Sequence, residues 1–256
     1  MNSTVANNYN SKVLVQMWTD FVNWKKRRKG ENGFLLKKLK QHKSKVLFDA
    51  CLGDGADSVY LIKNGFTVTS NDLDKLFIQK AKQNAKKHFV KLNATSYDWR
   101  RLDKHFPQNS FDAVLCLGNS LTYLFTKNDQ LKALKNFKKI LRPGGVLIID
   151  ERNYQYMLDK REEILNSQKF KYSGKYVYCG DKVHGKPVAI SDKNVRMEYT
   201  DEKTGKKGYL TLYPFKRREL LILLKKAGFS KIEQYSDYQK RYNISADFYQ
   251  YMALKK

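Results

Sequence analysis

Apolar residues are spaced along the first 150 residues in two alternating patterns. Side chains that recur every three or four residues predict amphipathic helices over residues 13–24, 34–39, 56–63, 74–87 and 128–141. Short apolar runs between them predict strands over residues 45–49, 66–70, 89–92, 111–116 and 145–150. Strands that alternate with helices form a mostly parallel sheet with helices on both faces, so we expect an α/β fold. Its ligand crevice should lie at the carboxyl ends of the strands.

The pattern changes after Asp150. Tyr, Val and Lys alternate through residues 175–213, and turn sequences at 179–181, 184–187 and 203–206 predict an antiparallel insertion. A helix over 216–227 and strands over 231–235 and 248–253 end the chain. We therefore expect four parts: an N-terminal helical arm or lid (1–43), a cofactor-binding core (44–160), an antiparallel substrate subdomain (161–215) and a C-terminal segment that completes the core sheet (216–256).

The composition narrows the class of protein. Among 256 residues, 41% are hydrophobic and 29% charged, which suits one large globular domain and excludes intrinsic disorder. No apolar run approaches the roughly 20 residues of a membrane span, and MNSTVANNYNSK lacks the features of a secretory signal. The three cysteines and four histidines lie far apart, which excludes a disulfide framework and the usual metal-ligand spacings. We expect a cytoplasmic protein with no metal and no membrane contact.

The charge is strongly positive. Fifty Lys and Arg residues against 25 Asp and Glu give +25, a balance that raises the prior for nucleic acid or another anionic partner. Only 11 of the 50 are Arg, the residue usually chosen for bidentate phosphate and base contacts, and the lysines are spread over most of the chain. A solvated lysine-rich surface is the favoured interpretation, and the charge alone does not exclude a nucleic-acid partner.

The segment Asp49-Ala-Cys-Leu-Gly-Asp-Gly55 follows the first predicted strand, and Asp72 follows the second. A glycine-rich turn lets a ligand approach the backbone, and an acid after the next strand can accept both ribose hydroxyls. The third glycine of a dinucleotide site is missing, and Asp54 would repel a pyrophosphate. Asp49 and Asp54 instead suit a positively charged nucleoside such as S-adenosylmethionine. A plain strand-to-helix turn is the alternative.

Three further segments follow predicted strands. Asp98-Trp99 offers an acceptor and a stacking face for an adenine, although Asp98 could simply cap a helix. Asn119, after the fourth strand, can orient a small polar group. Arg152, after the fifth, requires an anion such as a substrate carboxylate, or else pairs with Glu151 or another acid.

These segments give the chain a family resemblance. From about Tyr9 to its end it resembles the class I S-adenosylmethionine-dependent methyltransferases, and within them the glycine N-methyltransferase and glycine/sarcosine N-methyltransferase group. The similarity is strongest over residues 65–70, 111–120, 141–145 and 149–154. It implies the Rossmann-like class I methyltransferase fold, with a seven-stranded, mostly parallel sheet.

The resemblance also implies roles for single residues. Asp49 is expected to bind the cofactor because of its place in the glycine-rich segment. Together with it, the expected cofactor-binding residues are Tyr9, Arg28, Asp49, Ala50, Gly53, Asp72, Asp98, Trp99, Leu117 and Tyr123. Around the substrate we expect Arg152 and Asn119 on the carboxylate, and Tyr178, Tyr199 and Tyr213 near the amine and methyl. The chain departs from the family's pattern in its Cys-Leu-Gly-Asp-Gly loop, in Tyr123 where His is common, and in Phe21 where a substrate-side Tyr is common.

The implied activity is methyl transfer to the amine of a small amino acid: glycine, sarcosine or dimethylglycine. S-adenosyl-L-methionine is the expected cofactor, S-adenosyl-L-homocysteine its product, and no metal is expected. An RNA- or protein-directed methyltransferase that uses the basic surface is the alternative. Monomer and homo-oligomer both remain open.

Overall fold

The computed structural model describes residues 11–167 and 182–256. A large sheet runs through the centre, with strand order β3-β2-β1-β4-β5-β10-β9. The first five strands are parallel, whereas β10 is antiparallel to both β5 and β9. The strands are β1 (Val46–Asp49), β2 (Thr67–Asn71), β3 (Asn93–Thr95), β4 (Phe111–Cys116), β5 (Leu141–Arg152), β9 (Ser230–Ser236) and β10 (Phe248–Leu254). The expected α/β fold with a mostly parallel seven-stranded sheet is confirmed.

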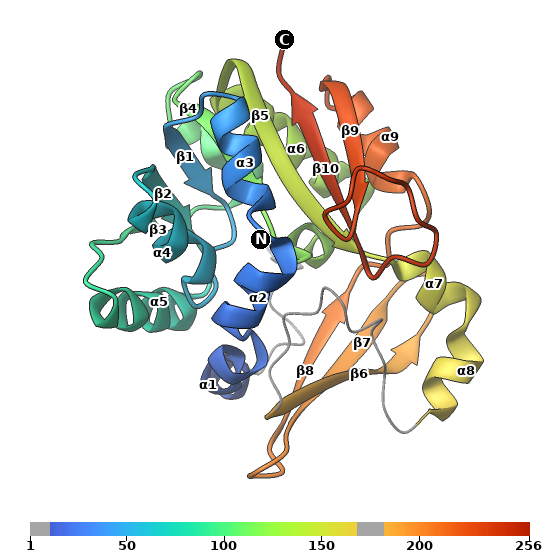
Figure 1. The fold of residues 1–256 in the computed structure, drawn as a ribbon. Helices are drawn as coiled ribbons and strands as arrows, with labels where there is room; N and C mark the ends of the chain where they lie inside the picture. Colours follow the sequence, from blue (N-terminus) through green and yellow to red (C-terminus); the bar gives the residue numbers. More distant parts are fainter. Residues whose placement is uncertain (1–10, 168–181) are drawn as a thin grey trace.

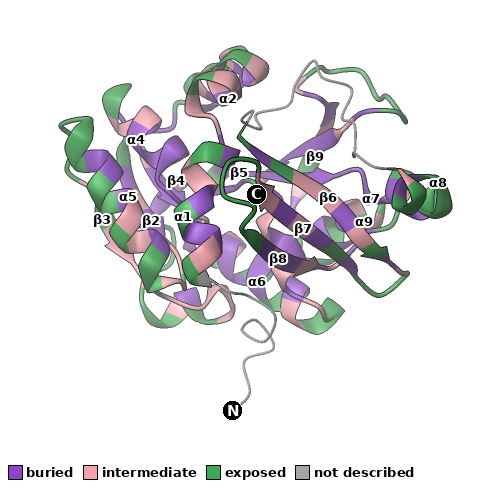
Figure 2. Ribbon diagram, turned by 90° about the horizontal axis from the view of Figure 1, so that it is seen from below, coloured by how far each residue is buried: buried purple, intermediate pink, exposed green. Residues whose placement is uncertain are grey.

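Helices cover both faces of this sheet because its inner strands are apolar on both sides. In β4, Val114 and Cys116 pack against one set of helices, whereas Ala113 and Leu115 pack against the other. The first set is α6 (Lys127–Ile140) and α9 (Glu219–Lys226), and the second is α3 (Phe34–Gln41) and α4 (Ala56–Lys63). Figure 2 shows the inner strands mostly in the colour of buried residues, while the outer side of α5 (Lys75–Lys87) carries exposed ones.

A second, three-stranded antiparallel sheet lies beyond the carboxyl ends of the parallel strands (Figure 1). It consists of β6 (Val183–Ile190), β7 (Val195–Asp201) and β8 (Lys207–Leu212). Its apolar face shares a core with α1 (Ser11–Phe21), α7 (Tyr154–Asp159) and α8 (Arg161–Asn166). Gly208 permits this packing, because a Cβ there would lie 2.7 Å from the buried Leu14 side chain.

The helices of the expected N-terminal arm therefore pack in different places. α1 contacts the small sheet, α3 packs on the large one, and α2 (Trp24–Glu31) lies between them (Figure 1). The helix predicted over residues 13–24 is confirmed as α1, but it ends at Phe21, where the chain breaks before α2. There Asn23 caps α2, and its side-chain oxygen accepts from the Lys26 N–H at 2.9 Å.

Two predictions are wrong. Residues 89–92 form no strand: Phe89 has a φ of 57° and is 97% exposed, and the strand lies at Asn93–Thr95 instead. The turn expected at 184–187 lies inside β6, because backbone pairing with β7 continues through it. The turn expected at 179–181 lies outside the described residues. The predicted cap of α5 is confirmed, since Asp74 accepts from the Leu76 N–H at 2.8 Å.

Within residues 11–167 and 182–256, no helix combines the length and the apolar character needed to cross a bilayer.

Candidate active site

A cavity of about 650 Å³ opens where the parallel strands end and the small sheet begins. Side chains from α1 and α2 close one side of it, and β7 and β8 contribute another wall. The structure brings ten of the expected residues into its lining, namely Ala50, Gly53, Asp72, Asp98, Trp99, Leu117, Asn119, Tyr123, Arg152 and Tyr199. Segments separated by about a hundred residues thus meet in one site.

Asp72 lies directly after β2 and is held by two backbone donors. The Gly53 N–H donates to its Oδ2 at 2.9 Å, and the Asp74 N–H donates to its Oδ1 at 2.9 Å. Gly53 makes the first contact from a left-handed conformation, φ +51°, which favours glycine. Burial raises the pKa of Asp72 to about 6, although the two N–H groups act in the opposite direction. A carboxylate fixed in this way can still accept from a pair of ribose hydroxyls.

Asp49 supports this loop from beneath and is absent from the cavity lining, contrary to the expected contact with a charged ligand. Its carboxylate accepts from the Ser58 hydroxyl at 2.5 Å and from the Cys51 N–H at 3.1 Å. Burial, with the nearby Asp57 second, raises the pKa of Asp49 to about 7. The acid of the loop that does line the cavity is Asp54.

Trp99 and Asp98 also line the cavity, next to the same loop. The Trp99 indole N–H donates to the Ala50 carbonyl at 2.8 Å, which fixes the ring against the loop. Asp98 caps the short helix η1 (Trp99–Lys104), and its Oδ2 lies 2.6 Å from the Arg100 guanidinium. Burial alone would raise the pKa of Asp98, but Arg100 outweighs it and lowers the pKa. An adenine amine would therefore share this carboxylate with Arg100.

The helix α2 is attached to the site by side-chain hydrogen bonds and ion pairs. The Trp24 indole N–H donates to Asp54 Oδ2 at 2.9 Å, and Arg27 forms a bidentate pair with Asp57 at 2.9 and 2.6 Å. Burial would raise the pKa of Asp57, but Arg27 and Arg28 hold it well below its usual range. Arg27, and not the expected Arg28, belongs to the cavity lining.

Arg28 points elsewhere. Its guanidinium pairs with Glu31 and Asp57 and lies 4.4 Å from the centroid of the Tyr60 ring. Tyr9, the other residue expected in the arm, lies outside the described residues.

Asn119 and Arg152 meet at the ends of β4 and β5. Asn119 adopts φ +66°, and its Oδ1 accepts from the Arg152 N–H at 3.0 Å while its Nδ2 donates to the Tyr154 hydroxyl at 2.6 Å. The Arg152 side chain is largely buried, with its guanidinium carbon 5.2 Å from the Phe248 ring centroid. A buried cation thus lies in the lining of the cavity, beside an amide whose orientation is fixed.

Two of the expected tyrosines line the cavity. Tyr199 is buried, with its ring 4.8 Å from that of Phe21 in an edge-on contact, and Tyr123 lines the same cavity. Burial raises the pKa of Tyr123 well above its usual value. Tyr213 does not line the cavity: its hydroxyl donates to Glu219 at 2.7 Å. Tyr178 lies outside the described residues.

Comparison with known proteins identifies the family. A family model described as a methyltransferase domain matches residues 47–145. The chain is 36% identical over 245 residues to the glycine/sarcosine N-methyltransferase of Aphanothece halophytica, which covers 94% of this chain and 88% of that one. It is 34% identical over 244 residues to the glycine/sarcosine N-methyltransferase of Halorhodospira halochloris. That alignment covers 95% of this chain and 87% of the relative. The chain belongs to the glycine/sarcosine N-methyltransferase family.

The fold of this glycine/sarcosine N-methyltransferase family member agrees with solved methyltransferases. An S-adenosylmethionine-dependent methyltransferase from Clostridium acetobutylicum superposes with a TM-score of 0.72 over 96% of this chain and 97% of that one, at 18% identity. The resemblance inferred from sequence is confirmed. The cavity's residues also fit S-adenosylmethionine: a fixed carboxylate for a ribose at Asp72, an indole beside the loop at Trp99, and the acid Asp54 for a positive charge.

Sequence reasoning missed part of the lining in this family member. Trp18, Arg27, Asp57, Phe77 and Leu210 all face the cavity. Trp18 and Phe77 lie within predicted helices, but which face of each helix meets the site depends on how α1 packs against α5. Asp57 follows the glycine loop by two residues, and this spacing was the one available signal.

Proposed function

We propose that this chain is an S-adenosylmethionine-dependent N-methyltransferase that methylates the amine of a small amino acid: glycine, sarcosine or dimethylglycine. The observation that carries the proposal is the buried Arg152 in a cavity that also contains Asp72 and Trp99. A guanidinium is the natural partner of a carboxylate. The family relatives named glycine/sarcosine N-methyltransferase support the same class of substrate.

The cofactor end of the cavity would be held by three groups. Asp72 would accept from the ribose hydroxyls, Trp99 would pack beside the adenine, and Asp54 would lie near the positive charge. When bound, S-adenosylmethionine would supply an electrophilic methyl group and leave as S-adenosylhomocysteine. Neither the binding of the cofactor nor the transfer of its methyl group needs a metal ion.

The substrate end would be organised by Arg152 and Asn119. Arg152 would bind the carboxylate and thereby direct the amine toward the cofactor end. Asn119 acts on this geometry through its hydrogen bond to the Arg152 N–H. Tyr199, packed against Phe21, would limit the space around the amine and keep water out. These residues position the reactants, and no covalent bond to the protein is required.

The amine must be neutral to attack, so its proton has to leave before methyl transfer. We expect the rate to rise with pH until the bound amine is fully deprotonated, and then to reach an alkaline plateau. A profile that is flat from about pH 6 to 10 would contradict this order of events.

The test is a methyl-transfer assay with labelled cofactor and, separately, glycine, sarcosine, dimethylglycine and bulk RNA as acceptors. We expect transfer to one or more of the amino acids and none to RNA. Transfer to RNA alone, with binding that weakens steeply as salt rises, would instead favour the nucleic-acid alternative.

Arg152 provides the sharper experiment. Arg152→Ala should raise KM for the amino acid by about 100-fold while the affinity for S-adenosylhomocysteine is retained. Arg152→Lys should fall between, because it keeps the charge but not the bidentate fork. Arg161→Ala, which removes an exposed arginine paired with Asp192, is the matched control and should change neither quantity. Parallel loss of both affinities in Arg152→Ala would contradict the assigned role.

A further inference from the structure

A second cavity, of about 410 Å³, lies beside the first and has no part in the proposed reaction. Among the described residues, Arg152 is the only one that lines both cavities. The second is bounded by the ends of β5, β9 and β10, by the residues that lead into α9, and by the loop between β9 and β10. Its chemistry differs between floor and rim.

The floor carries a buried carboxyl group among tyrosines. Glu151 is 4% exposed, and its Oε1 accepts from the Tyr251 hydroxyl at 2.7 Å. Its other oxygen, Oε2, is buried and has no hydrogen-bond partner within the described part of the chain. Tyr249 and Tyr242 lie beside it, with their rings stacked at 5.8 Å and an interplanar angle of 8°. A buried acceptor without a donor is costly, so a donor arriving in the cavity would be stabilised.

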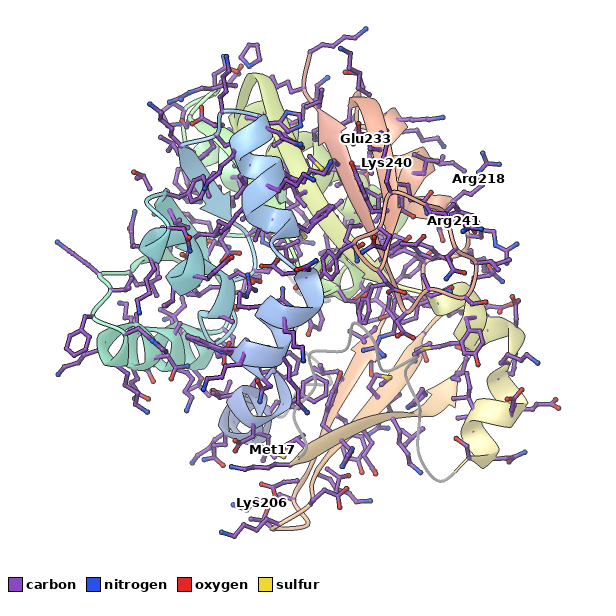
Figure 3. The ribbon with its side chains drawn as sticks, viewed as in Figure 1. Met17, Lys206, Arg218, Glu233, Lys240 and Arg241 are labelled. Atoms are coloured by element: carbon purple, nitrogen blue, oxygen red, sulfur yellow. The ribbon has the colours of Figure 1, made fainter. Side chains whose placement is uncertain are left out.

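The rim is positively charged. Lys216, Arg217 and Arg218 are exposed and line the opening. Arg217 lies 3.9 Å from Asp159, but within the described residues no carboxylate lies within 4 Å of the Lys216 or Arg218 side-chain nitrogens. Figure 3 shows Arg218 at the edge of the molecule, far from the hairpin that carries Lys206. The rim therefore favours an anionic group.

When Glu151 is ionised, only a ligand with both charges satisfies both ends. An ammonium would donate to Glu151 Oε2 and lie against tyrosine rings, and a carboxylate a few atoms away would meet the basic rim. Beside an ionised Glu151, a simple anion would leave Oε2 without a donor and be repelled by the carboxylate, and a simple cation would be repelled by three like charges at the rim. We propose that this cavity is a second binding site for a small zwitterionic amino acid, held by Glu151 at the floor and by Lys216 and Arg218 at the rim.

Glycine is the probe. Equilibrium dialysis of labelled glycine against the full chain saturated with S-adenosylhomocysteine should give two molecules bound per chain, and Glu151→Gln should lose one of them. Arg218→Gly should weaken the same site at least tenfold. It should not unfold the chain, because Arg218 has φ +66°, a conformation that glycine adopts without strain.

Lys206→Ser is the matched control, since it removes one exposed lysine from the distant β7–β8 hairpin and should change nothing. If the proposed methyl transfer is wrong, the wild type should still bind one glycine that Glu151→Gln abolishes, so the two proposals fail separately. Equal glycine stoichiometry and affinity in wild type, Glu151→Gln and Arg218→Gly, with melting temperatures unchanged, would overturn the second site.

Discussion

At the scale of single residues, the polar side chains of the site are fixed in place by hydrogen bonds to the backbone and to other side chains. Asp72 is fixed by the N–H groups of Gly53 and Asp74, and Asn119 is fixed by Asp150, Arg152 and Tyr154. Groups held in this way lose little conformational freedom when a ligand binds. Substitution of such a group should therefore lower the affinity for the ligand that it contacts.

Asp72→Asn tests this for the cofactor end. The amide can accept at only one atom, so one of the contacts to Gly53, Asp74 or the ribose must be lost. We expect the affinity for S-adenosylhomocysteine to fall by about 10- to 100-fold, measured by calorimetry. At saturating cofactor, KM for the amino acid should stay unchanged. Asp103→Asn, which changes a carboxylate paired with Lys139, is the control and should bind like the wild type.

Glu151 makes a second prediction about proton uptake and release. Burial raises its pKa to about 8, with Glu219 and Asp150 acting in the same direction and the Tyr251 hydroxyl acting against them. The cations at the rim, Lys216, Arg217 and Arg218, are exposed to solvent and screened. The carboxyl is therefore mostly protonated at pH 7, and an ammonium beside it would lower its pKa.

Glycine binding to the second site at pH 7 should thus release close to one proton. Calorimetry in two buffers of different ionisation enthalpy measures this number directly. Glu151→Gln should release none from this site. Proton release of the same size in wild type and Glu151→Gln would contradict the role of this carboxyl.

At the scale of helices and strands, predictions from sequence succeeded for strands that are buried on both faces of the sheet. The runs that became β1, β4 and β5 are apolar at every position of their inner parts, which leaves no alternative to a central strand. The helix α2 was missed because Trp-Lys-Lys-Arg-Arg-Lys-Gly-Glu reads as a solvated charge cluster. Arg27 is buried and pairs with Asp57, which lies 30 residues later in the chain.

The same limit applies to both cavities. The residues after each parallel strand could be predicted to meet, because the carboxyl ends of such strands share one edge. The second cavity could not be predicted, since Glu151, Arg218 and Tyr249 meet only after β10 has inserted antiparallel beside β5. Local sequence carries no signal for that placement.

Strand β6 offers a prediction for the small sheet. Gly185 faces Tyr199 across the β6–β7 pair, and a Cβ at this position would lie 2.9 Å from the Tyr199 ring. Gly185→Ala should therefore displace Tyr199, which is wedged against Phe21, and disturb the substrate end of the cavity. We expect kcat/KM for the amino acid to fall at least tenfold, while the affinity for S-adenosylhomocysteine is retained.

Gly205→Ala provides a control of the same chemistry. Its Cβ would meet nothing within 4 Å, although its φ of +66° makes the change cost some stability. The control should lower the melting temperature slightly and leave kcat/KM unchanged. A Gly185→Ala variant with the kinetics of the wild type would show that Tyr199 does not shape the substrate end.

At the scale of the whole molecule, the site lies where two cores meet. The large sheet with its helices supplies the cofactor end, and the small sheet with α1 supplies Tyr199 and Leu210. The fold also buries several carboxyl groups. Burial raises the pKa of Glu31 to about 7, of Asp49 to about 7, of Asp72 to about 6 and of Glu151 to about 8.

These raised pKa values contribute to how stability depends on pH. In the unfolded chain the four carboxyls ionise near pH 4, whereas in the folded chain they keep their protons to higher pH. Between about pH 4 and 8 these four groups therefore bind more protons in the folded state than in the unfolded state, so their contribution to stability falls as pH rises. The lowered pKa of Asp57 has the opposite effect, but only below about pH 4, since that group is ionised in both states above this range.

Asp49→Asn isolates one of these contributions, because Asp49 is buried and lies outside the cavity lining. For the wild type without ligands, we expect the free energy of unfolding to be lower at pH 8 than at pH 5. Asp49→Asn should reduce that difference by roughly 2 to 3 kcal/mol, about two units of pKa at 1.36 kcal/mol each. Urea denaturation at the two pH values measures it. Asp103→Asn should behave like the wild type, because Lys139 lowers the pKa of that carboxyl and it stays ionised throughout this range. An equal pH dependence in wild type and Asp49→Asn would show that Asp49 is ionised in the folded chain, and would assign the loop a fixed negative charge in place of a neutral support.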